Sequence, residues 1–151
     1  MSRASVKGRL GFTLVELAVV IVIIGVLAAF GVPRFLKSVE RTKASEAFAY
    51  LSAVRAAQER YIAKEGIYAD DVSKLDIVQV APKYFNNPTT IITSNDAGVP
   101  KWKLTLTRDG TTSSWGAYTI VFTQNGFCSD STILTTIASD ISPLAAGTAS
   151  D

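Results

Sequence analysis

The stretch Gly11–Pro33 reads GFTLVELAVVIVIIGVLAAFGVP, and the rest of the chain is organised around it. Residues 17–33 carry no charge. A helix needs about 20 mostly apolar residues to cross the hydrocarbon core of a bilayer, so residues 12–33 are long enough. The sequence therefore predicts a helix that can span a membrane.

One acidic residue, Glu16, lies just inside this apolar run. A carboxylate in a bilayer costs about 2.5–3.5 kcal/mol at the centre and less near the end of the span, so Glu16 calls for a positively charged partner. Cleavage after Gly11 would supply one, because Phe12 would then begin the chain with a free ammonium about one helical turn away. The alternative is that Glu16 snorkels in a plain membrane anchor.

Several features surround this junction: a short basic segment KGRLG at residues 7–11, Phe12 after Gly11, Glu16 as the fifth residue of the cleaved chain, the apolar run, and Pro33 near its end. The combination resembles the leader and N-terminus of type IV pilins and type II secretion pseudopilins. The strong resemblance covers residues 7–39. It implies that a prepilin peptidase cleaves between Gly11 and Phe12 and N-methylates Phe12.

The resemblance also implies a location and partners. The precursor would sit in the bacterial inner membrane, surrounded by lipid, until an inner-membrane assembly platform stacks it with further copies of itself into a helical homopolymer. In such filaments Glu16 meets the Phe12 ammonium of a neighbour, because two charges in an apolar core cost less when paired. Minor pilins or pseudopilins are further expected partners. The product is an extracellular pilus filament or a periplasmic pseudopilus.

Composition excludes several other classes. The net charge of +2 falls to −1 once Arg3, Lys7 and Arg9 of the leader are removed, so no basic field for nucleic acid remains. The chain has no His and one Cys, which excludes a His-based triad, a Cys/His metal cluster and an intramolecular disulfide. It also lacks a Gly-rich phosphate loop and a nucleophile with a base. We therefore predict a protein that is not an enzyme and has neither cofactor nor metal.

At 151 residues, one globular domain is the default, and the chain divides by pattern. The predicted segments are the basic leader 1–11, the transmembrane or filament-core half-helix 12–35, the amphipathic half-helix 36–65, a variable loop 66–100, an antiparallel sheet 101–141 and a loose tail 142–151. The leader keeps the N-terminus cytoplasmic, although Arg34 and Lys37 argue weakly the other way. A secretory signal cleaved near residues 29–31 is the alternative reading of the N-terminus.

The long helix is predicted from Phe12 to about Lys64. Beyond Pro33 it has an apolar stripe at helical spacing, and charged residues fill the other face. The stripe is Ala44, Ala47, Phe48, Leu51, Val54, Ala57 and Tyr61, and the charged face is Glu40, Arg41, Lys43, Glu46, Arg55, Glu59, Arg60 and Lys64.

Gly25, Gly31 and Pro33 are the weak points of this helix. In a helix interior Gly costs about 1 kcal/mol relative to Ala, and Pro about 3 kcal/mol. We predict that residues 25–33 are the segment most prone to lose helical structure in an assembled filament. An ordinary proline kink is the alternative.

The helix is predicted to end at Glu65–Gly66. The following Gly66-Ile67-Tyr68 is similar to a Gly-x-Tyr-Pro segment of pilins and pseudopilins, with Ala69 in place of the Pro. Residues 81–100 read as irregular. The acidic residues after the helix are interpreted as a solvated loop rather than a cation site, because their spacing matches no EF-hand-type loop; they are Asp70, Asp71 and Asp76.

Alternation predicts strands at residues 101–107 and 115–123, the Asn125-Gly126 pair predicts a hairpin, and a third strand is expected from Phe127 to about Ile137. The predicted fold class is therefore α+β, with the long helix packed on a small three-stranded antiparallel sheet, as in pilins. Four aromatic residues are assigned to the core rather than to a binding platform: Trp102, Trp115, Tyr118 and Phe122. Cys128 is interpreted as a buried, inert thiol rather than a link or lipidation site.

These observations favour a structural subunit of a type IV pilus. The alternative is the major pseudopilin of a type II secretion system, which the short head, three strands and lack of a disulfide favour. The missing calcium loop and the missing Pro after Tyr68 favour the pilin. A membrane-anchored protein with a binding head is the remaining class, and it predicts no cleavage after Gly11.

Overall fold

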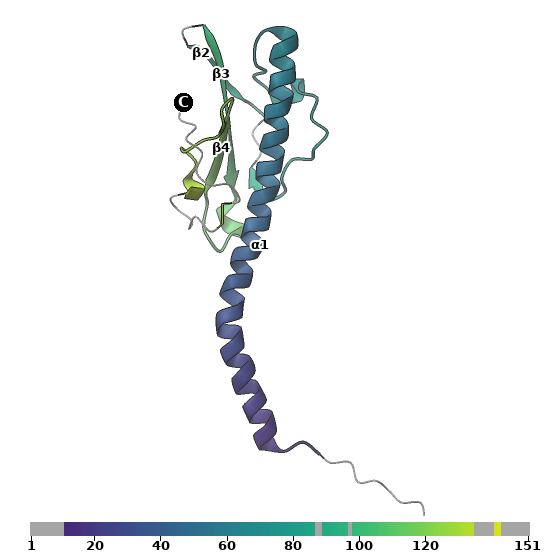
Figure 1. Cartoon of the computed structure of the whole chain (residues 1–151), viewed down its shortest axis with the longest axis vertical. Coiled ribbons are helices and arrows are strands. Elements are labelled where there is room, and N and C mark those ends of the chain that lie inside the picture. Colours follow the sequence, from purple (N-terminus) through teal and green to yellow (C-terminus); the bar gives the residue numbers. More distant parts are fainter. Residues whose placement is uncertain (1–10, 87–88, 97, 135–140, 143–151) are drawn as a thin grey trace, which may run out of the picture. The chain divides into compact units, whose positions relative to one another are not determined.

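The computed structural model describes residues 11–86, 89–96, 98–134 and 141–142. Residues 1–10 of the predicted leader, most of the predicted tail and the end of the third predicted strand lie outside these residues. The chain divides into two compact units, one ending at Leu36 and the other beginning at Lys37. Figure 1 shows the helix α1 (Leu14–Glu65), which contributes to both units, and the strands that belong to the second.

The long predicted helix is confirmed, with bounds within two residues of those expected. α1 ends where Gly66 adopts a left-handed conformation with φ of 78°, and the Gly66 N–H donates to the Ile62 carbonyl at 2.9 Å. A glycine tolerates this conformation without the penalty that a Cβ atom would bring. In this single subunit α1 is continuous through residues 25–33, so the predicted loss of helix in a filament stays a prediction.

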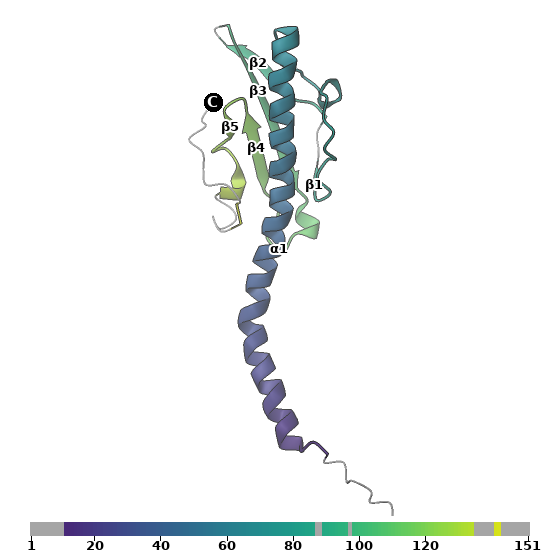
Figure 2. The same cartoon turned by 45° about the vertical axis from the view of Figure 1, so that its right-hand side comes forward.

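The sheet is antiparallel and is built around one long strand, β3 (Val99–Arg108). One side of β3 pairs with β2 (Ile92–Asp96) and with β1 (Phe85–Asn86), and the other side pairs with β4 (Thr119–Thr123). The short β5 (Gly126–Phe127) follows β4 through the predicted Asn-Gly turn. Figure 2 shows α1 crossing in front of this sheet.

The prediction of three strands is wrong, because the described part of the chain forms five. β1 and β2 lie in the stretch 81–100 that the sequence indicated as irregular. Both are short, β2 is mostly polar, and both pair with the long strand β3. The third predicted strand shortens to β5, and Thr132–Leu134 forms a 3-10 turn that buries Ile133.

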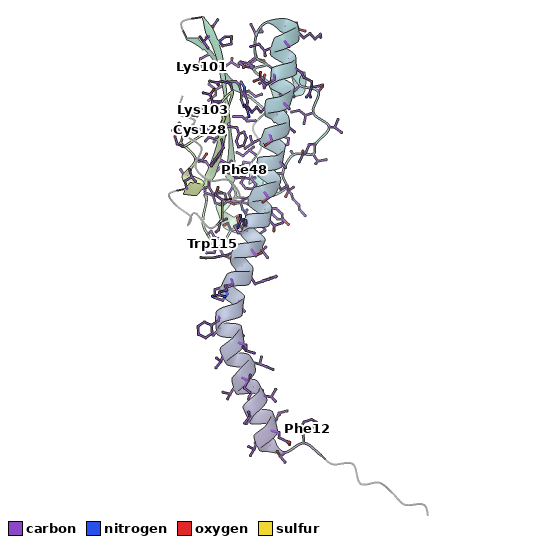
Figure 3. All side chains as sticks on the ribbon, viewed as in Figure 1. Phe12, Phe48, Lys101, Lys103, Trp115 and Cys128 are labelled. Carbon is purple, nitrogen blue, oxygen red and sulfur yellow. The ribbon has the colours of Figure 1, made fainter. Side chains whose placement is uncertain are left out.

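The core of the second unit lies between α1 and the sheet. From α1, Phe48 points toward the sheet (Figure 3) and makes edge-to-face contacts with Phe122 and Phe127, with ring centroids 5.8 and 4.8 Å away. The predicted aromatic residues Trp102, Tyr118 and Phe122 are buried, and Trp115 is partly buried against them. Cys128 is a buried free thiol, as interpreted from the sequence.

Candidate assembly site

The N-terminus of α1 is closed by two residues that bind each other. The backbone N–H and the hydroxyl of Thr13 both donate to Oε2 of Glu16, at 2.9 and 2.8 Å. In return, the backbone N–H of Glu16 donates to Oγ1 of Thr13 at 3.2 Å. Thr13 directly precedes the first residue of α1, so this reciprocal arrangement is a capping box.

Sequence reasoning missed Thr13, although the signal was present. A capping box reads Ser or Thr, two residues of any type, then Glu or Gln, and residues 13–16 read TLVE. The box explains why α1 begins here, and the positive end of the helix dipole also favours a carboxylate at this position. The Glu16 carboxylate therefore has a hydrogen-bond partner, Thr13, within the subunit. The ammonium that cleavage would create at Phe12 would be an additional partner.

The predicted cleavage point lies just outside α1. Gly11 and Phe12 have no regular secondary structure, and the Phe12 side chain is 88% exposed. Figure 3 shows Phe12 at the start of the helix. In this chain the nitrogen of Phe12 is a peptide amide, because Gly11 precedes it. The predicted pair between the Phe12 ammonium and Glu16 therefore concerns processed subunits and stays a prediction.

The three predicted weak points all lie inside α1. A Cβ atom added to Gly25 or Gly31 would meet nothing within 4 Å. Neither glycine is needed for close packing within the subunit. If glycine is required at these positions, the reason must be contact with other molecules or a change in helical structure. The prediction that residues 25–33 lose helical structure in a filament is of the second kind.

The first unit exposes a continuous apolar surface. α1 contains a stretch that is long and apolar enough to cross a membrane, and none of it is buried within the subunit. Exposed apolar area of this extent marks a membrane or protein contact. The most exposed large side chains in it are Leu14, Val15, Leu27, Phe30 and Phe35.

The second unit contains a buried ion pair that the sequence did not predict. Nε of Arg108 donates to Oε1 of Glu40 at 2.7 Å, and the hydroxyl of Tyr118 donates to the same oxygen at 3.0 Å. The Arg108 side chain is fully buried, and the Glu40 side chain is 4% exposed. Lys43 lies 3.6 Å from the other carboxylate oxygen of Glu40.

The remaining N–H groups of Arg108 also find acceptors. They donate to the carbonyls of Tyr84, Asp109 and Thr112 at 3.1, 3.0 and 3.2 Å, and to the Thr112 hydroxyl at 2.8 Å. Burial would raise the pKa of Glu40, but the hydrogen bonds from Arg108 and Tyr118 and the nearby positive charges outweigh it and lower that pKa. Burial and the Glu40 charge raise the pKa of Tyr118. The pair thus stays ionised and ties α1 to the end of β3.

The placement of Glu40 on the solvated face of the helix is therefore wrong. Glu40 precedes Ala44 by four residues and extends the same buried stripe. Arg108 likewise continues the alternating buried face of β3 after Leu104 and Leu106. The positions of both residues in the periodic pattern indicated burial, but charged residues are normally assigned to the exposed face.

The acidic residues of the loop after α1 lie at the surface. Each carboxylate has its own partner: Asp70 accepts from Lys74 at 2.6 Å, and Asp71 accepts from the backbone N–H of Ser73 at 2.7 Å. Asp76 accepts from Arg60 at 2.7 Å. Within the described residues, no three His, Cys, Asp or Glu side chains gather as a metal site would require.

Known proteins resemble part of the chain. A family model described as the prokaryotic N-terminal methylation motif matches residues 6–32. The type IV major pilin protein PilA of Myxococcus xanthus is 40% identical over 75 residues, which are 50% of this chain and 34% of that protein. The fimbrial protein EcpC of Eikenella corrodens is 38% identical over 78 residues, which are 51% of each chain.

A shorter stretch resembles the type IV narrow pilus major component PilA5 of Thermus thermophilus. It is 51% identical over 47 residues, which are 31% of this chain and 40% of that protein. The matched stretches thus span only about a third to a half of these relatives. No solved structure matches significantly.

Proposed function

Because the chain belongs to the type IV pilin superfamily, we propose that it is the structural subunit of a type IV pilus. The observation that carries this proposal is that the methylation motif, an exposed peptide bond and the start of the apolar helix all fall in one stretch of the chain. The methylation motif spans residues 6–32. Within it, the Gly11–Phe12 bond is exposed and non-helical, and α1 begins two residues after it. The apolar stretch of α1 that follows is not buried within the subunit. The relatives are named as pilins and fimbrial proteins, which favours the pilus over the pseudopilus.

The first proposed step is processing. Prepilin peptidase would cleave the Gly11–Phe12 bond and methylate the new amino group. An exposed bond without secondary structure suits a protease, because it can enter an active site without unfolding α1. The Thr13–Glu16 capping box lies wholly on the C-terminal side of the cut, so cleavage leaves it intact.

The second proposed step is assembly. Before it, the apolar surface of residues 14–36 is covered by membrane lipid, and the inner-membrane assembly platform, with minor pilins, transfers it to contacts with other copies. There the Phe12 ammonium of one subunit would pair with Glu16 of another. Both groups would be costly alone in an apolar filament core, and pairing lowers that cost. The product would be an extracellular helical filament.

The experiment is an intact-mass and N-terminal analysis of the protein in two fractions: filaments sheared from cells, and the cell envelope. We expect chains that begin with N-methylated Phe12 to dominate the sheared fraction. Processed chains that stay in the envelope would instead support the pseudopilus. A chain that still begins before Phe12 in both fractions would overturn the filament proposal.

A further inference from the structure

The second unit contains a cavity that the proposed filament function does not use. Its volume is about 330 Å³, and it lies between the C-terminal end of α1, the loop that follows and the edge formed by β2. Lys101 of β3 marks this end of the sheet in Figure 3. The side chains that matter for its chemistry are Tyr61, Tyr68, Asp70, Lys74, Thr93 and Asn95.

The wall opposite β2 is held by buried hydrogen bonds. The side-chain amide of Gln58 binds the backbone of Ala69 twice: Nε2 donates to the carbonyl at 2.8 Å, and Oε1 accepts from the N–H at 2.9 Å. The loop is then joined to the start of β2, because the Ile91 N–H donates to the Asp70 carbonyl at 2.8 Å. A wall fixed in this way loses little conformational freedom when a ligand binds.

One aromatic side of the cavity is also fixed. The ring of Tyr68 packs edge-to-face against the buried Trp102, with centroids 6.5 Å apart, and its hydroxyl donates to Glu59 at 3.4 Å. Tyr61 adds a second ring from the last turns of α1. Tyrosine rings supply rigid, amphipathic contact area that binds the apolar face of a partly polar ligand.

The opposite side is polar. β2 contributes the hydroxyl of Thr93 and the amide of Asn95, and both residues are exposed. Among the described strands, β2 pairs only with β3, so its other edge is not covered by a strand. Hydroxyl and amide groups bind ligands that carry several hydroxyls, each of which both donates and accepts.

The charges of the cavity favour an uncharged ligand. Lys101 also lines the cavity, but it alternates with the buried Trp102 along β3, so its side chain belongs to the opposite face of the sheet. Lys74 and Asp70 form an ion pair at 2.6 Å, so each neutralises the other. An aliphatic ligand would leave the polar side chains of β2 without partners, which costs free energy. The volume falls at the lower end of the range for small-molecule sites. We propose that this cavity binds one or two residues of an uncharged saccharide, with the tyrosine rings against its C–H face and β2 on its hydroxyls.

The test uses the full chain as unpolymerised subunits in detergent micelles, so it does not depend on whether the chain forms a pilus. The probes are β-linked trisaccharides of glucose, galactose and N-acetylglucosamine, and binding is measured by saturation-transfer NMR and by titration. The variants are Tyr61→Ala and Asn95→Ala. The matched control is Asn86→Ala, because Asn86 is also an exposed asparagine on an edge strand paired with β3 but lies outside the cavity.

We expect at least one trisaccharide to bind, and each cavity variant to weaken its binding about fivefold, the effect of one lost hydrogen bond or ring contact. Asn86→Ala should bind as the unmodified chain does. Asn95→Ala keeps the test decisive if Tyr61→Ala proves to disturb the end of α1. The proposal is overturned if none of the three sugars binds, or if the cavity variants bind as tightly as the control.

Discussion

Two glutamates of α1, Glu16 and Glu40, occupy opposite situations. Glu40 is buried in the second unit and meets Arg108 and Tyr118 of the same chain. Glu16 lies in the apolar first unit, and its hydrogen bonds run to the neutral groups of Thr13. Within the described residues, the charge of Glu40 is thus balanced in the same molecule, whereas the hydrogen bonds of Glu16 lead to uncharged groups. The second unit, called the head below, therefore balances its buried charge by itself, whereas the N-terminal part of α1 leaves a charge for the partner that the proposed assembly supplies.

The largest expected effect follows from removing one member of the buried pair. Glu40→Ala leaves the Arg108 guanidinium buried without its counter-charge, so the free energy of unfolding should fall by about 3–5 kcal/mol. Urea unfolding of the full chain in micelles, followed by tryptophan fluorescence, measures this change. Glu16→Ala is the matched control and should leave the unfolding of the head within about 0.5 kcal/mol.

A double variant separates the charge from the packing. Glu40→Leu combined with Arg108→Met should recover most of the stability lost in the single variant, because a well-packed apolar pair often replaces a buried ion pair without loss. If the double variant is as unstable as Glu40→Ala, the network stabilises the head mainly through the carbonyls that Arg108 binds.

The second prediction concerns Glu16 and filament assembly instead of Glu40 and the stability of the head. Glu16→Ala should still insert in the membrane but should lower the yield of sheared filaments at least tenfold, the equivalent of about 1.4 kcal/mol. Glu16→Gln is the sharper variant, because glutamine can still close a capping box but carries no charge. Quantitative immunoblots of the sheared fraction measure the yield. Normal yield from Glu16→Gln would contradict the proposed charge pair.

The third prediction concerns acid. Because the pKa of Glu40 is lowered in the folded head, its contribution to stability is complete above its ordinary value of 4.5 and is lost as the pH falls through the lowered value. The free energy of unfolding should therefore decrease below about pH 4.5. Glu40→Gln should show a shallower decrease in the same urea titrations. Equal slopes would show that other carboxylates, such as Asp70 and Asp76, dominate the acid response.

A smaller effect is expected from Thr13→Ala, which removes the cap but keeps the Glu16 charge. The first turn of α1 should lose about 1 kcal/mol, the usual cost of an N-cap substitution. Hydrogen exchange at the amides of residues 14–17 should speed up, while the filament yield falls much less than in Glu16→Gln. A yield as low as that of Glu16→Gln would mean that the cap, rather than the charge, limits assembly.

The smallest expected effect comes from Gly25→Ala and Gly31→Ala. Each should stabilise the helix of the isolated subunit by up to about 1 kcal/mol, because the added methyl group meets no neighbour. Thermal unfolding by circular dichroism in micelles measures this gain. If residues 25–33 lose their helix in the filament, the same substitutions should lower filament yield, and unchanged yield would favour the plain proline kink.

Periodicity in the sequence predicted the parts of the fold that depend on local pattern. The apolar stripe of α1 and the burial of Trp102 and Phe122 followed from it, and Gly66 marked the end of the helix. β1 and β2 could not be predicted, since β1 has only two residues and β2 is mostly polar, and such strands depend on pairing with a partner such as β3. Glu40 and Arg108 fit the buried stripes of their elements, but the energy that permits their burial comes from a partner distant in sequence. Thr13 is different, because its role was readable from residues 13–16 alone.

The capping box has a further consequence for how a filament could come apart. If Glu16 pairs with the Phe12 ammonium of another subunit during assembly, its carboxylate already accepts two hydrogen bonds from Thr13 before the pair forms. For this carboxylate, polymerisation then becomes an exchange or sharing of hydrogen-bond partners. A subunit that leaves the filament can satisfy its carboxylate at once, so the same joint that closes readily can also reopen and return an intact subunit to the membrane.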